Sequence, residues 1–405
     1  LGNPEAREFM SFCINNKIEL RIVPPVNEWI NGSLEARQLR KVSIDDLLGR
    51  EEIKLDTAAI QNGLAGKTIL ITGAAGSIGS EIVRQLASFQ TGRIILLDQA
   101  ESALFDLQNE LLRKYKELRE FDIVIADITN RQRMENIFRF YRPRIVFNAA
   151  AYKHVPLLEQ NVSEAVWVNI GGTKTLADLS VRYGVEKFVM ISSDKAVNPT
   201  SVMGATKRIC ELYVQCLSKE NSCPTRFVTT RFGNVLGSSG SVVPLFSKQI
   251  EQGGPVTLTH RGMKRYFMTI PEACQLVLEA GFMGRGGEIY VFDMGEPVSI
   301  YDLAVKMITL AGLEPEKDIK IVETGIRPGE KLFEEIICDM EANLPTHNPK
   351  ILIASMNHID PAVIIPKIEE LLAMCNNQPD NRLVEKIKDL VPEYAGQQLG
   401  NPVTC

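Results

Sequence analysis

Short apolar runs alternate with amphipathic stretches along most of the chain from about Gly66 onward. The runs have the length of strands, and the stretches between them repeat apolar residues at helical intervals, as at Ile78, Ile82, Val83 and Leu86. The expected strands are 68–72, 93–98, 122–126, 144–148, 187–192 and 226–230. This alternation predicts an α/β fold with a Rossmann-like, doubly wound parallel sheet that carries helices on both faces.

The first strand-to-helix junction contains Gly73, Gly76 and Gly79. Glycines let the backbone turn sharply and let a phosphate approach the free N–H groups at the start of a helix. An ordinary turn would also explain them, but the next strand ends in Asp98, where a dinucleotide fold places the acid that holds the adenosine ribose. We therefore favour nucleotide binding over a bare turn. Because Asp98 would repel a 2′-phosphate, NAD is favoured over NADP.

Composition narrows the class of protein. With 405 residues, of which 45% are hydrophobic, the chain can bury one large core or two moderate ones. A net charge of −5 without a long basic run argues against a nucleic-acid groove or a polybasic membrane patch. The eight cysteines form no C-x-x-C pair and the four histidines lack metal-ligand spacing, so we expect free thiols in a reducing compartment and no metal site.

Polar and small residues follow the third and fourth predicted strands. Asp127 would either accept a hydrogen bond from adenine or cap the next helix. Ala149, Ala150 and Ala151 leave room for a cofactor. The loop 152–156 after them is polar and cationic, and it fits a surface loop and a substrate-lining loop equally well.

The fifth predicted strand delivers the reactive side chains. Ser193, Asp194 and Lys195 follow it at the carboxyl edge of the sheet, where ligands bind in this architecture. Met203 and Lys207 lie four residues apart at the start of the next helix and so share one face. Lys207 suits a bond to the nicotinamide ribose beside the oxidised ring, and the alternative is a solvated helix lysine.

Three cationic clusters occur further along this acidic chain. They are residues 231–241 with Arg231 and Asn234, the group Arg261, Lys264 and Arg265, and the loop 325–331 with Arg327, Glu330 and Lys331. Each cluster alone would more often be a solvated surface. Together they predict an anionic ligand, because guanidinium groups match phosphate oxygens.

Six motifs occur together in this chain. They are TGAAGSIG at 72–79, SDK followed by AVNP at 193–199, MGATK at 203–207, RFGNVLG at 231–237, RYFMTIP at 265–271 and RPGEK at 327–331. In combination they resemble the bacterial UDP-N-acetylglucosamine 4,6-dehydratases of the long, membrane-anchored polysaccharide-biosynthesis type. These belong to the extended short-chain dehydrogenase/reductases. The match covers roughly residues 60 to 340.

The resemblance implies that the chain acts on UDP-N-acetylglucosamine with a tightly held NAD. The implied product is a UDP-4-keto-6-deoxy sugar for capsule, O-antigen or glycoprotein glycans. The implied steps are hydride removal from C4, loss of water across C5 and C6, and hydride return to C6. Oxidation comes first because a C4 ketone acidifies the C5 proton.

One position departs from most short-chain enzymes, which carry a tyrosine four residues before the lysine of the MGATK motif. This chain has Met203 there, which cannot titrate, and the long dehydratases share that feature. The resemblance assigns catalysis to Ser193, Asp194, Lys195, Met203 and Lys207. Ser193 would orient the C4 oxygen, and Asp194 would take the C4 proton, directly or through water, and protonate the C6 hydroxyl. Lys195 would remove the C5 proton, which requires its pKa to fall from about 10.4 toward roughly 7 to 8.

The resemblance also assigns binding residues. Those for the cofactor are Gly73, Ala75, Gly76, Ser77, Ile78, Gly79, Asp98, Asp127, Ile128, Ala149, Ala150, Ala151 and Lys207. Those for the substrate are Lys153, His154, Asn169, Asn234, Ser241, Val242, Lys248, Arg265, Arg327 and Glu330. A UDP-sugar 4-epimerase and a catalytically silent NAD-binding sensor stay open as alternatives. The C5 stereochemistry also stays open, although Met203 resembles the retaining group.

The chain divides by sequence into four segments. We expect a lead-in module over 1–60, an NAD-binding domain over 61–235, a smaller α/β domain for the nucleotide sugar over 236–345, and a helical tail over 346–405. The lead-in resembles the stretch that follows an N-terminal transmembrane region in the long dehydratases. With Leu1 in first place and no apolar run of about eighteen residues, we expect a soluble fragment of an enzyme at the cytoplasmic face of the inner membrane, assembled as a homo-oligomer.

Overall fold

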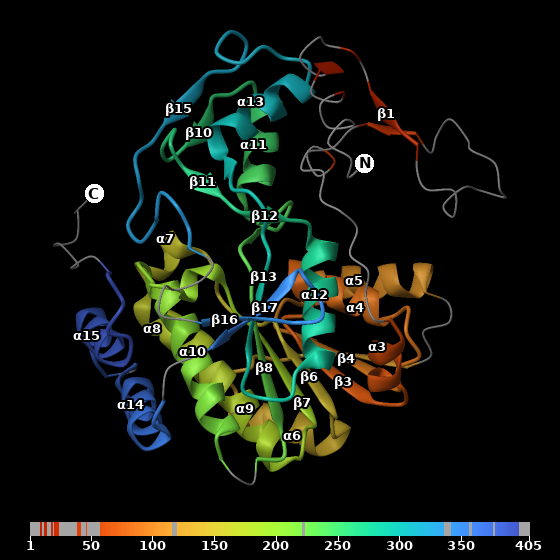
Figure 1. Cartoon of the computed structure of the whole chain (residues 1–405), viewed down its shortest axis with the longest axis vertical. Coiled ribbons are helices and arrows are strands. Elements are labelled where there is room, and N and C mark those ends of the chain that lie inside the picture. Colours follow the sequence, from red (N-terminus) through yellow and green to blue (C-terminus); the bar gives the residue numbers. More distant parts are fainter. Residues whose placement is uncertain are drawn as a thin grey trace. The chain divides into compact units, whose positions relative to one another are not determined.

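The computed structural model describes residues 57–115, 120–220, 223–335, 342–355, 359–375 and 377–396, together with scattered residues between 9 and 46. It divides into two compact units (Figure 1). The larger unit comprises residues 55–233, 270–295 and 327–405, and the smaller unit comprises residues 1–54, 234–269 and 296–326. The division into four consecutive segments stays a prediction.

A nine-stranded sheet forms the centre of the larger unit, in the order β16-β17-β13-β8-β7-β6-β3-β4-β5 (Figure 1). The strands are β3 Thr68–Thr72, β4 Arg93–Asp98, β5 Phe121–Ile125, β6 Ile145–Asn148, β7 Lys187–Ile191, β8 Arg226–Arg231, β13 Ile289–Phe292, β16 Ala342–Pro345 and β17 Ile351–Ser355. Neighbours from β13 to β5 are parallel, and β16 and β17 add an antiparallel edge. Apolar runs such as 69–71 suit this sheet because helices cover both of its faces.

Helices of the larger unit pack in two groups. They are α3 Thr57–Leu64, α4 Ser77–Leu86, α5 Glu101–Lys114, α6 Arg131–Tyr141, α7 Val155–Leu158, α8 Val162–Ala165, the π-helix η3 Val166–Gly171, α9 Gly172–Arg182, the 3₁₀ helix η4 Asp194–Ala196, α10 Val202–Ser218, α12 Ile270–Met283, α14 Pro361–Met374 and α15 Asp380–Leu390. Helix α12 packs against α3 and α4, and α10 packs against α9, α14 and α15. The sheet therefore separates the two groups, as expected for a doubly wound fold.

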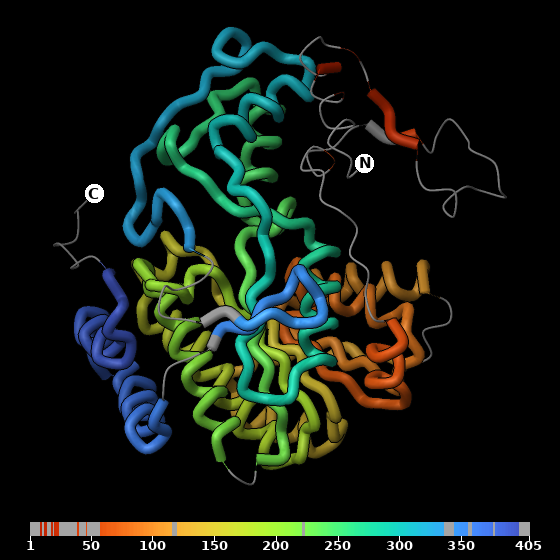
Figure 2. The backbone as a smooth tube through the Cα atoms, in the orientation of Figure 1, coloured from red at the N-terminus to blue at the C-terminus, as the bar shows by residue number. Residues whose placement is uncertain are grey.

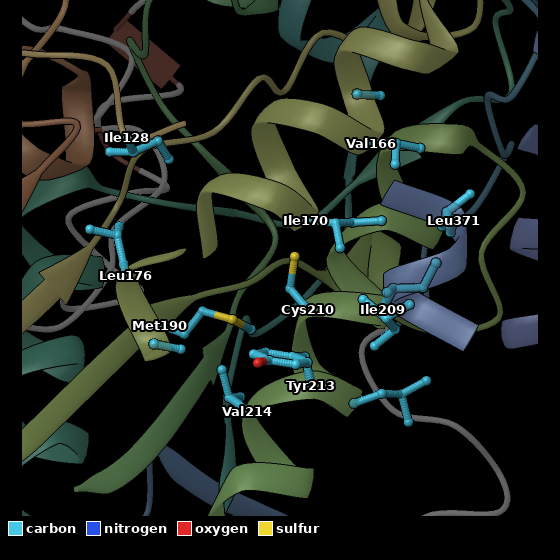
Figure 3. Packing of buried hydrophobic residues seen from close by; sticks show 14 of the residues in the cluster. Ile128, Val166, Ile170, Leu176, Met190, Ile209, Cys210, Tyr213, Val214 and Leu371 are labelled. Carbon is cyan, nitrogen blue, oxygen red and sulfur yellow. The ribbon is translucent and has the colours of Figure 1, made fainter. Parts of the chain in front are cut away.

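Helix α10 is enclosed on nearly all sides, since all but two of its 17 residues are buried. Cys210 and Tyr213 of this helix lie among Ile170 of η3, Met190 of β7 and Leu371 of α14 (Figure 3). Such a helix is apolar around most of its circumference. Any charged side chain that it carries must therefore find a partner inside the protein.

The smaller unit has its own core, which includes Phe246, Leu303 and Ile308. Its elements are β1 Arg21–Ile22, β2 Arg40–Lys41, β9 Asn234–Val235, α11 Val242–Glu251, β10 Val256–Leu258, β11 Lys264–Arg265, β12 Phe267–Met268, β14 Val298–Ser299, α13 Ile300–Leu310 and β15 Ile321–Glu323. Figure 2 follows the chain from β8 into this unit, back to α12 and β13 of the larger unit, and out again to β14.

The predicted α/β fold is confirmed, and the strand bounds are close to the expected ones. β3 and β4 have the predicted bounds, β7 ends one residue earlier at Ile191, and β8 runs one residue further to Arg231. The range 346–405, expected to be a helical tail, contains α14 and α15. The lead-in module expected over 1–60 lies largely outside the described residues.

The expectation of free thiols is confirmed within the residues that the structure describes. Those cysteines that it describes are free thiols: Cys13, Cys210, Cys216, Cys223, Cys274 and Cys375. In the described ranges, no helix is both long and apolar enough to cross a bilayer. No cluster of three or more metal-ligating side chains occurs among the described residues either.

Candidate active site

The carboxyl ends of β3, β4, β6 and β7 meet at one edge of the sheet, because these strands are parallel neighbours. The turn from β3 to α4 lies at this edge. Gly73 has a φ of 66°, and a Cβ on it would lie 2.6 Å from the Ala150 nitrogen. A Cβ on Gly79 would lie 2.1 Å from the Gly73 oxygen. Both positions therefore require glycine. The turn leads into α4, whose N-cap is Gly76 and whose first N–H groups lack intrahelical partners.

Asp98, at the end of β4, contacts this turn directly. Its Oδ2 accepts a hydrogen bond from the Ala75 N–H at 3.0 Å, and its Oδ1 accepts one from the Ala100 N–H at 3.0 Å. Ala149 lies close by, since its N–H donates to the Thr72 carbonyl at the end of β3. The glycine turn, the acid and the small residues expected around a dinucleotide therefore lie together.

Asp127 follows β5 and forms a local turn. Its Oδ1 accepts from the Thr129 N–H at 2.8 Å. The N-cap of α6 is instead Asn130, whose side chain accepts from the Arg133 N–H at 3.0 Å. The interpretation of Asp127 as the cap of this helix is therefore wrong. Ile128, beside it, is buried.

The loop after β6 is held by Asn169 of the π-helix η3. Asn169 Oδ1 accepts from the Tyr152 N–H at 2.8 Å, and its Nδ2 donates to the Tyr152 carbonyl and to Thr206 Oγ1. This buried amide therefore positions the loop within the protein. The side chains of Lys153 and His154 reach solvent, but nearby atoms desolvate them and lower the pKa of both, with the charge of Lys153 lowering that of His154 further.

Ser193, Asp194 and Lys195 form a hydrogen-bonded cluster at the end of β7. Ser193 Oγ donates to Asp194 Oδ1 at 2.8 Å, and Lys195 Nζ donates to the same oxygen at 3.0 Å. Asp194 is only 1% exposed, and its Oδ2 is buried without a hydrogen-bond partner among the described residues. A buried carboxylate oxygen without a partner is costly, and it marks an atom that a ligand can satisfy.

A second carboxylate reaches the cluster from far along the chain. Glu334 Oε1 lies 3.5 Å from Lys195 Nζ, and its side chain is 4% exposed. The sequence gives no signal for this residue, because 139 positions separate it from Lys195 and its neighbourhood carries no motif beyond RPGEK. Two carboxylates beside one amine favour the ammonium form, which is opposite to the state that a base requires.

Met203 and Lys207 lie on α10 and are both buried. Lys207 Nζ donates to the Ile191 carbonyl at the end of β7, at 3.0 Å. The alternative of a solvated helix lysine is therefore wrong. Burial lowers the pKa of Lys207, while Cys210 and Glu211 act in the opposite direction.

A buried ion pair lies one strand away from the catalytic cluster. Arg231, at the end of β8, donates from Nε and Nη2 to the two oxygens of Glu211 at 2.7 and 2.6 Å. Ser192 Oγ donates to the same carboxylate at 2.7 Å. The expectation that Arg231 contributes to an anion-binding loop is therefore corrected, because its guanidinium is fully buried against Glu211. One signal for this pair was available, since Glu211 is an acid within an apolar stretch of α10.

The RPGEK loop belongs to the larger unit. Arg327 is exposed, and the Oε2 of Glu330 is buried without a hydrogen-bond partner among the described residues. Lys331, expected beside an anionic ligand, donates from Nζ to the Val197 carbonyl at 3.2 Å. This part of the loop is thus bound to the chain that follows the catalytic cluster.

The remaining predicted substrate residues belong to the smaller unit. They are Asn234, Ser241, Val242, Lys248 and Arg265. Ser241 is the N-cap of α11, and its Oγ is buried without a hydrogen-bond partner in the described part of the chain. Arg265 is buried and donates from Nη1 to the Lys264 carbonyl at 2.8 Å.

Known proteins resemble most of this chain. The family model described as "Polysaccharide biosynthesis protein" matches residues 69–356. The capsular polysaccharide biosynthesis protein CapD of Staphylococcus aureus is 47% identical over 385 residues, which are 95% of this chain and 63% of that protein. The chain thus spans about three fifths of the length of this relative.

Two relatives carry names for different reactions. A UDP-N-acetylglucosamine 4,6-dehydratase (inverting) of Campylobacter jejuni is 34% identical over 283 residues, covering 69% of this chain and 80% of that protein. A UDP-glucose 4-epimerase of Rickettsia rickettsii is 31% identical over 282 residues, covering 68% and 79%. Sequence similarity alone therefore leaves both reactions in view.

Solved structures share the fold. Pen from Bacillus thuringiensis matches with a TM-score of 0.67 at 32% identity, covering 78% of this chain and 99% of that chain. DesIV, a dTDP-glucose 4,6-dehydratase from Streptomyces venezuelae solved with NAD, matches with a TM-score of 0.59 at 22% identity, covering 66% and 87%. The second likeness concerns the fold alone. From its sequence matches and its sheet, the chain belongs to the polysaccharide biosynthesis protein family within the extended short-chain dehydrogenase/reductases.

Proposed function

We propose that this chain is the catalytic part of an NAD-dependent UDP-N-acetylglucosamine 4,6-dehydratase. It converts UDP-N-acetylglucosamine to UDP-2-acetamido-2,6-dideoxy-xylo-hexos-4-ulose for capsule, O-antigen or glycoprotein glycans. The observation that carries this proposal is the buried Asp194: one of its oxygens accepts from both Ser193 and Lys195, and the other has no partner among the described residues. A 4,6-dehydratase needs an acid and a base for the loss of water, and this pair supplies both.

The strand edge fits a dinucleotide. The positions that cannot carry a Cβ, Gly73 and Gly79, keep the turn compact beside the start of α4. In our proposal the pyrophosphate binds at the N-terminus of α4 and the adenosine ribose binds Asp98. The amine of Lys207 lies at the carboxyl end of β7, two strands from β3, and binds the nicotinamide ribose. NAD, when bound, supplies a hydride acceptor for C4 and a hydride donor for C6.

Asp194 and Lys195 perform the proton transfers. Lys195 takes the C5 proton, and Asp194 protonates the C6 hydroxyl, which leaves as water while the C5–C6 double bond forms. The acid must be protonated and the base neutral, which is the reverse of their usual ionisation near pH 7. Lys195 gives its proton to solvent once the substrate is bound, and Asp194 gains its proton from the C4 hydroxyl during oxidation, so the neutral base and the protonated acid are both present when the C5 proton is removed.

The C4 hydroxyl loses its proton without help from position 203. Met203 is buried and cannot titrate. Ser193 holds the C4 oxygen, and its Oγ already donates to Asp194 Oδ1. A proton released from the C4 oxygen therefore reaches Asp194 through an existing hydrogen bond, and Asp194 later delivers that proton to the C6 hydroxyl.

Nine residues are assigned to the binding of the nucleotide sugar. In the larger unit, Lys153, His154, Arg327 and Glu330 bind the nucleotide sugar. In the smaller unit, Asn234, Ser241, Val242, Lys248 and Arg265 do so. The buried Glu330 Oε2 and Ser241 Oγ, which have no partner among the described residues, support this assignment because both atoms need one. Asn169 supports the substrate loop indirectly, through Tyr152.

A UDP-sugar 4-epimerase is the second candidate, and the R. rickettsii relative supports it. An epimerase needs to oxidise and reduce only C4. The buried acid beside a lysine favours the dehydratase, because an epimerase needs neither a base at C5 nor an acid at the C6 hydroxyl. If the chain were a catalytically silent NAD-binding sensor, the buried Asp194 Oδ2, which has no partner among the described residues, would have no function.

Mass spectrometry after incubation with UDP-N-acetylglucosamine separates the three functions. We expect loss of one water from the sugar. An altered configuration without a change in mass would identify the epimerase, and no turnover despite bound NAD would identify the sensor. NMR of the product then assigns the C5 configuration, for which we propose retention.

The setting in the cell is also part of the proposal. We place the full protein at the cytoplasmic face of the bacterial inner membrane, as a homo-oligomer. Fractionation of the full-length protein tests the first statement. Sedimentation of this chain tests the second.

A further inference from the structure

Residues 327–335 lie against the chain that follows the catalytic cluster. Thr200 Oγ1 donates to the Gly329 carbonyl at 3.0 Å. Lys331 Nζ donates to the Val197 carbonyl at 3.2 Å. We call residues 327–335 the clasp segment, because these hydrogen bonds attach it to residues 197–200.

The close approach at Gly329 shows how tightly the clasp segment is attached. Gly329 has a φ of 77°, and a Cβ on it would lie 2.9 Å from Glu159 Oε1 and 3.0 Å from the Ser201 Cβ. Glu159 Oε1 also accepts from the Val202 N–H at the start of α10, at 2.7 Å. The clasp segment is therefore built against the same helix that carries Met203 and Lys207.

Beyond these attachments, the clasp segment delivers Glu334 to the catalytic cluster. Glu334 is buried, and its Oε1 lies 3.5 Å from Lys195 Nζ. Asp194 Oδ1 lies 3.0 Å from the same nitrogen. The Lys195 ammonium thus has two carboxylates within ion-pair distance, one from its own turn and one from the clasp segment.

Charged groups on the elements around Lys195 are engaged elsewhere. Their partners are the Ile191 carbonyl for Lys207, Arg231 for Glu211, the Val202 N–H for Glu159, the Val197 carbonyl for Lys331, and Asn198 for Glu335. Asp194 and Glu334 both lie at ion-pair distance from Lys195.

We propose that Glu334 is a positioning residue that holds the amine of Lys195 against Asp194 and keeps it protonated until the substrate is bound. A carboxylate within about 4 Å favours the charged form of an amine, and burial strengthens the effect. Without Glu334, Lys195 would lose its proton at lower pH and would have one anchor fewer. The proposal deepens the dehydratase assignment and rests on it for the role of Lys195, but the titration of Lys195 can be measured without turnover.

The test is trace acetylation of the full chain over a range of pH, with the labelled fraction of Lys195 read by peptide mass spectrometry. Only the neutral amine reacts, so the midpoint reports when Lys195 loses its proton. In Glu334→Gln we expect the midpoint to move down by about one pH unit or more. The exposed Lys317 serves as the internal reference in every sample.

Two further variants keep the test decisive. Glu335→Gln removes the neighbouring acid, which binds Asn198 at 2.6 Å, and should leave the Lys195 midpoint unchanged. Glu334→Asp keeps the charge and should hold the midpoint near that of the unaltered chain, which also covers the case in which Glu334→Gln does not fold. An unchanged midpoint in Glu334→Gln, or an equal shift in Glu335→Gln, would overturn the proposal.

Kinetics give a separate readout. The pH profile of kcat in Glu334→Gln should move to lower pH, with KM for UDP-N-acetylglucosamine nearly unchanged. If the unaltered chain shows no loss of water from the substrate, the dehydratase assignment fails while the acetylation midpoint still judges Glu334. A shifted midpoint with an unmoved kcat profile would overturn the link between Glu334 and the reaction.

Discussion

Two buried ion pairs lie at the same edge of the sheet, and they differ in how many of their carboxylate oxygens accept hydrogen bonds. In the Glu211–Arg231 pair, both carboxylate oxygens accept hydrogen bonds, from the two guanidinium nitrogens and from Ser192. In the Asp194–Lys195 pair, one oxygen carries two hydrogen bonds and the other carries none from the described residues. The protein supplies hydrogen bonds to both carboxylate oxygens of the first pair, whereas one carboxylate oxygen of the second pair can still accept a hydrogen bond from a ligand.

The number of hydrogen bonds to each carboxylate distinguishes a structural ion pair from a catalytic one more clearly than the exposure of the carboxylate does. Glu211 and Asp194 are equally inaccessible, at 0% and 1% exposure. A saturated buried pair resists removal of either member, because the remaining charge would stay in the interior without a partner. An unsaturated pair lowers the stability of the free protein by about 1–3 kcal/mol, and a ligand that supplies the missing contact removes this cost.

The largest effect should come from breaking the open pair. Lys195→Met should lower kcat by up to about 10⁴-fold, because it removes the general base. NAD content and substrate affinity should stay nearly unchanged. Exchange of the C5 proton with solvent deuterium, followed by NMR, should disappear, and exchange that persists in this variant would remove Lys195 from the role of base.

Breaking the saturated pair should instead affect folding. Arg231→Met should lower the free energy of unfolding by about 3 kcal/mol, because Glu211 loses its bidentate partner and keeps only Arg208 as a cationic neighbour. Thermal or denaturant unfolding measures the loss. The double variant Arg231→Met/Glu211→Leu should recover much of it, and a double variant as unstable as the single one would refute the pairing argument.

A smaller effect should follow at Ser241, which tests whether an orphan polar atom marks a ligand contact. Ser241→Ala should raise KM for UDP-N-acetylglucosamine about tenfold, since a hydrogen bond to a charged group contributes about 1.5–3 kcal/mol. The matched control is Thr225→Val. Thr225 Oγ1 is also buried without a partner among the described residues, but it precedes β8 at the opposite edge of the sheet. Its KM should not change, and equal effects of both variants would break the comparison.

The smallest effect concerns a partly exposed pair. Glu110 binds Arg84 through two hydrogen bonds of 3.0 Å, and the hydrogen bond from Arg84 is the main cause that lowers the pKa of Glu110 to about 2. Because the pKa is lowered, the ionised carboxylate stabilises the folded protein at pH values above about 4.5. This stability is lost as the pH falls toward about 2. Solvent screening limits the contribution to about 1 kcal/mol. Glu110→Gln should therefore flatten the stability curve between pH 5 and 2, as measured by urea unfolding, and a slope equal to that of the unaltered chain would contradict this account.

The sheet could be predicted from the sequence because its signals are local. The runs that became β3 and β4 are apolar, short and bounded by Gly73 or Asp98. The sequence therefore indicated both the length of these strands and their burial on two faces. The cluster at Ser193, Asp194 and Lys195 could be placed for the same reason, since it directly follows a strand.

Contacts between distant charges could not be predicted in this way. Arg231 looked like an anion-binding residue because its neighbours are glycine and serine, yet its partner Glu211 lies twenty residues earlier on a different element. Glu334 reaches Lys195 only because the clasp segment folds back onto residues 197–200. Neither contact follows from periodicity or motif, since both depend on how separate elements pack.

The enclosure of α10 also bears on how the protein opens in solution. Amides of a helix buried on nearly all sides exchange with deuterium only when the whole unit unfolds. We expect the amides around Lys207 to be among the slowest to exchange. Residues 327–335 form no helix or strand, so their amides should exchange through local opening despite the side-chain contacts of the segment. The acid and the base would then lie between a part of the protein that almost never opens and a part that opens often.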